Sequence, residues 1–362
     1  MIEVLIFIGK IQPSSIPFEM AKKTHERQDV NVTLVSFYDK NKSEVEASAS
    51  EGLMNSVLLD GKSRFDPSAW RRLYKEMSKD KYDIIHTHQN FIGSVARVIA
   101  EFCDISIVDT EHRPHDSFTL LQNLVNAPTL RLADKVVSNS HSTQSSFRWY
   151  EELILSDHQK EVVYNGIDIN RIDSRVQSAE PSNELAIITV GRFVRVKNIS
   201  TIIQSFSLIK KEFPDATLVL VGYGPLREEL EDLCKNLNIS SDVRFTGKVS
   251  RNRVYEELAG AKVFALMSFA EGFCVSAVEA MAAGLPVVAS DIDVLHEVIG
   301  DSGVFVNPGD PDEIAKALAE LLENSEKRRR QGEEARERAR TTFSIDRTVR
   351  EYAKIYRELA DS

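Results

Sequence analysis

The sequence predicts an α/β protein made of two Rossmann-like, doubly wound domains, each a parallel sheet with helices on both faces. Short apolar, β-branched runs alternate with helical segments along the chain, which is typical of parallel strands joined by crossover helices. The length of 362 residues is too great for one ordinary core and suits two domains. We expect the domains to face a cleft, because open α/β sheets bind ligands at the carboxyl ends of their strands.

In the first half, apolar runs predict strands and amphipathic runs predict helices between them. The predicted strands are Glu3–Ile8, Val32–Phe37, Asp83–His86, Ile105–Asp109, Lys135–Ser138 and Val162–Tyr164. The predicted helices include Pro67–Met77 and Ser117–Leu132. The initial run "MIEVLIFIGKIQP" is interpreted as a first strand rather than a signal peptide, since it has no basic region and no small-residue cleavage site.

The second half repeats this alternation of strands and helices. The predicted strands are Leu185–Val190, Ala216–Val221, Val243–Phe245, Val263–Leu266, Pro286–Ala289 and Val304–Val306. A helix is expected over 198–211, and another begins at Val275 and ends at Gly284, a left-handed cap. The charge-mixed segment "ENSEKRRRQGEEARERARTTF" predicts a solvated helix with i,i+4 ion pairs.

A polar segment separates the two halves. It runs from Asp173 to Leu185, contains Pro181, and lies between a finished strand and a new one. We therefore expect a first domain over residues 1–176 and a second over 183–343.

Composition excludes several classes of protein. Apolar residues make up 42% and charged residues 28% of the chain, as in globular proteins, and a net charge of -10 argues against nucleic-acid binding. Three widely spaced cysteines form neither a disulfide framework nor a metal-ligand pattern, so a reducing cytosol is expected. The sequence shows no apolar stretch long enough to span a bilayer.

The segment "VGRFVRVKN" follows an apolar strand and brings two cations to the expected cleft. Gly191 permits a sharp turn, and Arg192 and Lys197 then suit a diphosphate, the first through a forked contact and the second as a point charge. The alternative is that both are solvated surface cations.

A second turn, "LVGYGPLREELE", has Gly224 where backbone could approach a ligand, but Arg227 breaks the dinucleotide pattern G-x-G-x-x-G.

The segment "EGFCVSAVEAMAAGLPVVAS" begins with one carboxylate and carries a second, Glu271 and Glu279. The amides of Gly272, Phe273, Cys274 and Val275 open a helix and would attract an anion. Carboxylates instead accept hydrogen bonds from hydroxyls. A nucleoside diphosphate sugar offers both phosphates and hydroxyls. Otherwise the two acids are ordinary solvated positions.

The stretch from Val190 to Ser290 resembles the C-terminal domain of the group-one retaining glycosyltransferases, which have the GT-B architecture. Their E-x7-E pattern is met by the two acids and their G-R-x4-K pattern by "GRFVRVK"; "VGYGPLREELE", "VRFTGKVS" and "VYNGIDINRI" match further family stretches. The resemblance implies that Gly191, Arg192 and Lys197 hold the diphosphate and that Glu279 holds the ribose. It further implies that Glu271 and the loop amides contact the sugar, with Gly224 beside the donor and Val249 binding the base through its backbone.

In the first half, the resemblance implies a histidine that bonds the donor sugar near its anomeric carbon. His112 in "VDTEHRPHDSF" is favoured, and His88 in "DIIHTH" is the alternative. His86 and His88, with His115 in the same region, leave a metal site as a further alternative, although no metal is predicted. The family has a Gly-Gly pair after the first strand, whereas "IGKIQPSSIPF" has only Gly9, followed by Lys10. The contacts of this loop with donor and acceptor are therefore expected to differ.

The predicted function is retaining transfer of a hexose-type sugar from a UDP- or GDP-sugar to a glycan, lipid-linked or small-molecule acceptor, with no cofactor. The resemblance implies that helix 344–362 packs back on the first, acceptor-side domain. The alternatives are a nucleotide-sugar-binding regulatory protein without transfer activity and a nucleotide-sugar epimerase on the same fold.

A cytoplasmic location is expected. "WRRLYKEMSKDKY" (Trp70–Tyr82) suggests peripheral membrane contact, with an ordinary surface helix as the alternative.

Overall fold

The computed structural model describes residues 1–12, 15–41, 55–179 and 185–361. The chain forms two compact units. Unit 1 comprises Met1–Gly166 and Ile345–Ser362, and unit 2 comprises Ile167–Ser344. Unit 2 is therefore inserted into unit 1, whose last helix is separated from the rest of it by the whole of unit 2.

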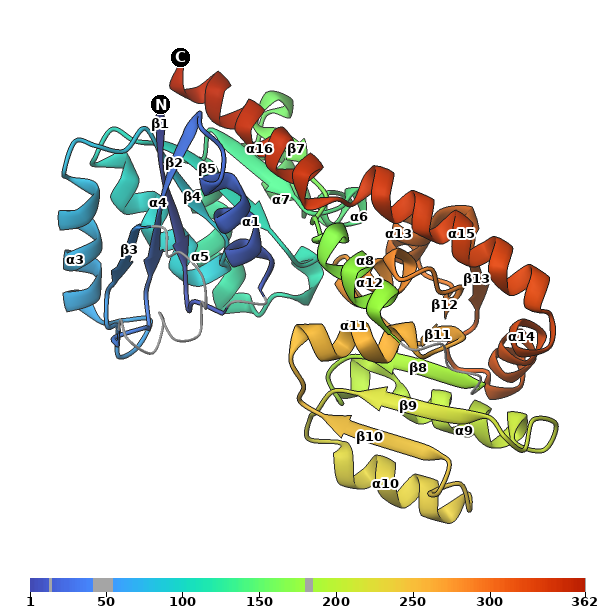
Figure 1. Cartoon of the computed structure of the whole chain (residues 1–362). Coiled ribbons are helices and arrows are strands. Elements are labelled where there is room, and N and C mark those ends of the chain that lie inside the picture. The colour runs from blue at the N-terminus through green and yellow to red at the C-terminus, as the bar shows by residue number, and fades with distance from the viewer. Residues whose placement is uncertain (13–14, 42–54, 180–184, 362) are drawn as a thin grey trace. The chain divides into compact units, whose positions relative to one another are not determined.

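Unit 1 is built on a seven-stranded parallel sheet of order β3-β2-β1-β4-β5-β6-β7 (Figure 1). Its strands are β1 (Ile2–Ile8), β2 (Val30–Ser36), β3 (Asn55–Leu58), β4 (Ile84–Thr87), β5 (Ser106–Glu111), β6 (Lys135–Ser138) and β7 (Lys160–Val162). Its helices are α1 (Ile16–His25), α3 (Pro67–Met77), α4 (Asn90–Glu101), α5 (Leu120–Leu130), α6 (His141–Ser145), α7 (Trp149–Ile154) and α16 (Ile345–Ala360).

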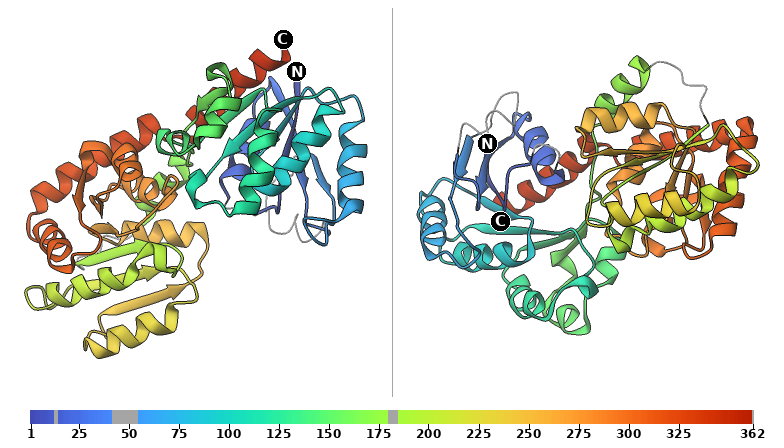
Figure 2. Two further views of the ribbon diagram at one scale, coloured as in Figure 1. Left: turned by 180° about the vertical axis from the view of Figure 1, so that it is seen from behind. Right: turned by 90° about the horizontal axis from the view of Figure 1, so that it is seen from below.

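Alternation along the central strand β1 produces two hydrophobic layers in unit 1. Val4, Ile6 and Ile8 pack with residues of α1 and α16 on one face. Leu5 and Phe7 pack with residues of α3 and α4 on the other. Successive side chains of a strand point to opposite faces, so an unbroken apolar strand requires helices on both sides. Figures 1 and 2 show α1 on one face of this sheet and α4 and α5 on the other.

Unit 2 has a six-stranded parallel sheet of order β10-β9-β8-β11-β12-β13. Its strands are β8 (Ala186–Val190), β9 (Thr217–Val221), β10 (Val243–Gly247), β11 (Val263–Leu266), β12 (Val287–Ser290) and β13 (Gly303–Val306). Its helices are α8 (Ile169–Ser178), α9 (Ile199–Ile209), α10 (Arg227–Asn236), α11 (Arg251–Ala259), α12 (Val275–Ala282), α13 (Asp293–Ile299), α14 (Pro311–Glu323) and α15 (Ser325–Thr342). The fold class predicted from the sequence, two doubly wound parallel-sheet domains, is confirmed.

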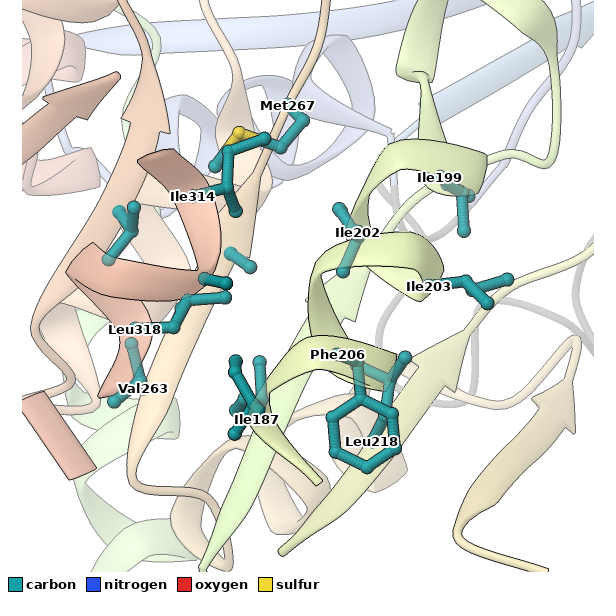
Figure 3. Close-up of a cluster of buried hydrophobic side chains, with 14 of the residues drawn as sticks. Ile187, Ile199, Ile202, Ile203, Phe206, Leu218, Val263, Met267, Ile314 and Leu318 are labelled. Carbon is teal, nitrogen blue, oxygen red and sulfur yellow. The ribbon is translucent and has the colours of Figure 1, made fainter. Parts of the chain in front are cut away.

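The core of unit 2 lies between its sheet and the helices α9 and α14 (Figure 3). Ile202 and Phe206 of α9 and Leu318 of α14 pack against strand residues such as Ile187 and Val263, and all five side chains are fully buried. Asp310 caps α14 by accepting hydrogen bonds from the amides of the first turn, and a proline occupies that turn. This core fixes the carboxyl ends of β8 and β11, which carry the predicted donor residues.

The division between the units lies earlier in the chain than the predicted boundary near residue 176. Helix α8 lies beyond Gly166 and packs against α11 and α12, so the structure groups it with unit 2. Residues 180–184 of the predicted linker, including Pro181, lie outside the described residues. At the other end, Ile345–Ser362 belongs to unit 1.

Candidate active site

In unit 2, the two predicted diphosphate-binding cations follow β8. Arg192 is exposed and has no carboxylate partner in the part of the chain that the structure describes. Lys197 ends a short 3-10 turn, Arg195–Lys197, and its ammonium forms an ion pair with Glu271. Asn198 follows with a positive φ of 48° and donates from Nδ2 to the carbonyl of Pro308 at 2.7 Å. Asparagine tolerates this left-handed backbone conformation better than most residues do. The hydrogen bond to Pro308 holds Asn198 in place and so fixes the start of α9.

Glu271 is bonded within unit 2. Its Oε1 pairs with Lys197 and accepts a hydrogen bond from Ser268 Oγ at 2.7 Å, and its side chain is 9% exposed. Burial works to lower the pKa of Lys197, but Cys274 and the Glu271 carboxylate outweigh it and hold that pKa above its usual value. The acid and the cation, expected to contact different parts of the donor, are thus bonded to each other.

Glu279 is buried in α12, with 4% of its surface exposed. Its Oε1 lies 2.6 Å from Arg251 Nε and accepts a hydrogen bond from Tyr255 Oη at 3.1 Å. Both partners lie on α11, one helical turn apart. A buried carboxylate is costly unless it is paired and hydrogen-bonded, and these partners meet that need. Sequence reasoning missed Arg251, although the i,i+4 spacing of an arginine and a tyrosine after "VRFTGKVS" was visible.

Helix α12 begins at Val275, so the amides of Gly272 to Val275 lie at its N-terminus, as predicted from the sequence. Cys274 is the N-cap residue, with a left-handed φ of 71°. Burial, followed by the charge of Glu271, raises the pKa of its thiol to about 12, so it is not a nucleophile at neutral pH. The Phe273 ring packs edge-on against Phe343 at 5.4 Å, so only its backbone is available to a ligand.

The glycine turn after β9 is shaped by its neighbouring loop. A Cβ added to Gly224 would overlap the backbone of Phe193, and one added to Gly222 would overlap the carbonyl of Gly191. The need for glycine at position 224 is therefore explained by the backbone of Phe193, which packs directly against it. The sequence suggested instead that a ligand comes close to the backbone there. Gly191 itself has room, since the nearest atoms belong to the Lys197 side chain at 3.9 Å. Val249 is half-buried between β10 and α11.

In unit 1, the two candidate histidines lie side by side after β4 and β5. His88 Nδ1 and His112 Nε2 are 3.1 Å apart, and the rings are stacked with centroids 5.4 Å apart. His86 is buried beside them; its Nδ1 lies 2.6 Å from Tyr356 Oη of α16 and its Nε2 lies 2.7 Å from Thr110 Oγ1. Burial lowers the pKa of His86 to about 3 and that of His112 to about 4, so both are neutral at neutral pH.

Two adjoining hollows of unit 1 share this histidine pair. One, of about 450 Å³, is lined by Gly9, Lys10 and the loop after them. The other, of about 370 Å³, is lined by Arg64, Arg113 and residues at the start of α4. Tyr38, His88, Gln89 and His112 line both. The structure thus brings together the loop residues and both histidines that the sequence singled out in this half. Residues 13–14 of the loop lie outside the described residues.

A buried ionic network lies behind the histidine pair and was not foreseen. Arg97 of α4 is fully buried, and its Nη1 lies 2.5 Å from Asp109 Oδ1 of β5. Asp109 also accepts a hydrogen bond from Thr87 Oγ1, which ties β5 to β4. Glu111 accepts from Asn126 Nδ2 at 2.6 Å, and burial, with the charge of Asp109, raises its pKa. The available signal was an arginine inside the apolar segment "FIGSVARVIA".

The metal and membrane alternatives gain no support from the geometry. Within residues 1–12, 15–41, 55–179 and 185–361 the structure shows no group of three or more His, Cys, Asp or Glu arranged to hold a metal ion. His115 is hydrogen-bonded to Glu151 instead, at 2.9 Å.

In the basic and aromatic segment Trp70–Tyr82, Trp70 packs on Phe37 with ring centroids 4.4 Å apart, and Tyr82 is buried. No described helix has the length and apolar character needed to cross a bilayer.

Two family models match this chain, one in each half. The family model "Glycosyl transferases group 1" matches residues 170–338, and "Glycosyltransferase Family 4" matches residues 18–171. The N-acetyl-alpha-D-glucosaminyl L-malate synthase of Bacillus anthracis is 30% identical over 308 residues, which cover 81% of this chain and 79% of the relative. The phosphatidyl-myo-inositol mannosyltransferase of Mycolicibacterium smegmatis is 27% identical over 273 residues, covering 73% and 68% of the two chains.

Among solved structures, Anabaena HepE in complex with UDP and glucose superposes with a TM-score of 0.83 at 20% identity, covering 99% of this chain and 100% of that one. Similarity at that level of identity shows a shared fold. The family matches and the identity with the malate synthase go further, because together they span both units. The chain belongs to the group 1 glycosyltransferases.

Proposed function

We propose that this glycosyltransferase moves a sugar from a nucleoside diphosphate sugar, UDP- or GDP-linked, to an acceptor hydroxyl with retention at the anomeric carbon. The observation that carries the proposal is the cluster at the N-terminus of α12, where Lys197, the largely buried Glu271 and the first amides of the helix meet. Cation, helix amides and acid in one place suit a ligand with both phosphates and hydroxyls. The complexes of HepE with UDP and with UDP-glucose support a nucleotide-sugar donor.

In the proposed donor complex, Arg192 and Lys197 hold the diphosphate together with the α12 amides. These groups stabilise the negative charge that develops as the nucleoside diphosphate leaves, with no metal ion required. Lys197 is already paired with Glu271, so a diphosphate must displace or share that carboxylate. We infer that donor binding turns Glu271 towards the sugar, which couples capture of the phosphates to positioning of the hexose.

Glu279 is proposed to hold the ribose hydroxyls and Val249 the base. Oε1 of Glu279 is already bonded by Arg251 and Tyr255, which fixes the carboxylate group while a ribose approaches. On the unit 1 side, His112 is proposed to bond the sugar near its anomeric carbon, with His88 orienting it through the 3.1 Å contact. A neutral His112 would act through a hydrogen bond rather than a charge.

The acceptor is proposed to be a small molecule, a glycan or a lipid-linked sugar acceptor. The names of the two relatives, with L-malate and phosphatidyl-myo-inositol in them, support a hydroxyl-bearing acceptor. A cytoplasmic location is proposed because all three cysteines are free thiols.

The test is incubation with a panel of UDP- and GDP-sugars and hydroxylated acceptors. We expect release of nucleoside diphosphate, and a product whose anomeric proton coupling in NMR matches that of the donor. An inverted product would exclude the retaining mechanism. Tight nucleotide binding without transfer to any acceptor or to water would favour the regulatory alternative, and interconversion of free nucleotide sugars would favour the epimerase.

A further inference from the structure

We propose that the 370 Å³ hollow of unit 1 binds the acceptor through an anionic group, a carboxylate or a phosphate, held by Arg64 and Arg113. This inference rests on the proposed function, since it names the substrate class that unit 1 would bring to the donor sugar. The acceptor is thus a small hydroxylated anion, whether free in solution or carried as a lipid headgroup.

The charge of the hollow is the first argument. Arg64 and Arg113 line it, and neither has a carboxylate partner among the residues that the structure describes. The only acidic residue of the lining, Glu111, is buried and accepts a hydrogen bond from Asn126. The chain carries a net charge of -10 and pairs many of its arginines with acids. Arg113 donates only to the carbonyl and hydroxyl of Ser117, each at 3.5 Å, so two arginines without a carboxylate partner in the described residues give this hollow a local positive charge.

The two arginines are also held in place by aromatic rings. The Arg64 guanidinium lies 5.3 Å from the ring centroid of Phe65 and 5.1 Å from that of Phe91. The Arg113 guanidinium lies 5.6 Å from the ring centroid of Phe118. Stacking on a ring uses the face of a guanidinium and leaves its N–H edges for a carboxylate or phosphate. Because the rings limit the freedom of these side chains, less entropy is lost when they bind an anion.

Buried polar atoms without partners indicate that the ligand also carries hydroxyls. His88 is 6% exposed, and its Nε2 has no hydrogen-bond partner in the described part of the chain. The Oδ1 and Nδ2 atoms of Asn90 are likewise buried and unpartnered. Both residues line the hollow. Buried polar groups are normally satisfied, and an amide beside an imidazole offers the donor and acceptor sites that a hydroxyl needs.

The size of the hollow limits the ligand. A volume of about 370 Å³ lies at the lower end of the range for small-molecule sites. It suits a hydroxy acid or a single phosphorylated ring, with any lipid or glycan extension lying outside. An anionic group near the two arginines then leaves a hydroxyl near His88 and Asn90, beside His112.

The test compares acceptors with and without the anionic group: L-malate with its uncharged diamide, and myo-inositol phosphate with myo-inositol. We expect kcat/KM to be at least roughly tenfold higher for the charged member of a pair. Arg64→Gln and Arg113→Gln should each raise KM for the charged acceptor roughly ten- to a hundredfold, with a smaller change in kcat. The control is Arg131→Gln, which removes an exposed arginine of unit 1 that lines neither hollow and should change nothing.

Vesicles containing phosphatidylinositol, compared with phosphatidylcholine vesicles, separate the two sources of the anion. Glycosylation of the lipid but not of the soluble phosphate would identify a headgroup, and the reverse a free anion. Equal use of charged and uncharged acceptors, or equal losses for both in the arginine variants, would overturn the inference while transfer itself continued.

Failure of the proposed function gives a different pattern. UDP binding by calorimetry and slow donor hydrolysis by water report on the donor residues without any acceptor. If neither occurs, the proposed function fails, and thermal shift still tests the hollow with L-malate and myo-inositol phosphate as probes. Stabilisation by these anions that is absent with their uncharged counterparts, and lost in the Arg64→Gln/Arg113→Gln double variant, supports the site. No selective stabilisation refutes it.

Discussion

Glu271 and Glu279 lie in the same short stretch of unit 2, yet they have different partners. Glu271 pairs with Lys197, a residue proposed to bind the same ligand. Glu279 pairs with Arg251, which holds it from a separate helix. The first pair can exchange with a diphosphate, whereas the second is a fixed part of the fold. The two acids should therefore respond differently to substitution.

Glu279→Ala should both destabilise the protein and weaken donor binding. It leaves Arg251 without its carboxylate, and because that side chain is 19% exposed we expect a loss of about 2–3 kcal/mol in the free energy of unfolding, below the ~3–5 kcal/mol of fully buried pairs. Loss of the ribose contact should raise donor KM roughly ten- to a hundredfold with kcat little changed. Denaturant unfolding and steady-state kinetics measure the two effects, with the exposed Glu228→Ala as control. A fall in kcat alone would assign Glu279 to the reacting sugar.

Glu271→Gln should have the opposite signature. It frees Lys197 from its internal carboxylate, so UDP should bind at least as tightly as to the unmodified protein. The loss of a group that contacts the sugar should nevertheless lower kcat. Calorimetry with UDP and turnover with the UDP-sugar measure the two sides. A tenfold loss of UDP affinity would show that Glu271 supports the phosphate site rather than competing for it.

At the scale of the element, β4, β5 and α16 meet around two buried histidines, His86 and His88, and the half-buried His112. Burial lowers the pKa of His86 to about 3 and of His112 to about 4, and holds that of His88 well below its usual value. Each is about 6.5 in an unfolded chain, so between pH 6.5 and 4 the unfolded state binds more protons than the folded state. Folding is therefore most favourable above pH 6.5 and weakens as the pH falls.

The expected slope is about 1.4 kcal/mol per pH unit for each histidine that stays neutral in the folded state. Urea unfolding at intervals from pH 7.5 to pH 5 should show a flat region followed by this decline. His86→Gln should reduce the slope by about one histidine's share, whereas His158→Gln, at an exposed position, should leave it unchanged. A slope that is the same in all three proteins would contradict the assignment.

Elements with strong periodicity were predictable from the sequence, and Lys135–Ser138, Val263–Leu266 and Pro67–Met77 are strands and a helix with the predicted bounds. Strand β3 was missed because Asn55 and Ser56 give it little apolar character at the edge of a sheet. The predicted strand Val162–Tyr164 is displaced to Lys160–Val162, since its register is set by pairing with β6. Pro225, a residue that favours the first turn of a helix, instead lies in the turn before α10, which begins at Arg227.

For the candidate site, residues that belong to sequence motifs were foreseen and their partners were not. Lys197 and Glu271 could each be singled out, but their ion pair joins loops 74 residues apart. Arg251 and Arg97 were missed for the same reason, since the acid that each one compensates lies on another element. Local pattern identifies the chemistry of a residue, while long-range packing decides which groups are already satisfied.

At the scale of the whole molecule, α16 should be essential to unit 1 and dispensable for unit 2. Its Val349, Tyr352 and Tyr356 are buried against the β1 face of the unit 1 sheet. Truncation after Phe343 removes this layer and the bond from Tyr356 to His86. We expect unit 1 to unfold or aggregate and unit 2 to retain UDP binding. Calorimetric scanning with and without UDP measures both, and full transfer activity in the truncated protein would contradict the assignment.

The insertion of unit 2 into unit 1 also sets an order of events on the ribosome. Residues 1–166 emerge before unit 2, but α16, which shares with α1 the covering of one face of their sheet, is made only after all of Ile167–Ser344. Phe18 and Met20 of α1 and the strand residues beneath them must therefore wait with an incomplete layer while unit 2 is synthesised. Nascent unit 2 can fold as soon as it leaves the exit tunnel, so the later half of this chain matures before the earlier one, the reverse of the usual vectorial order.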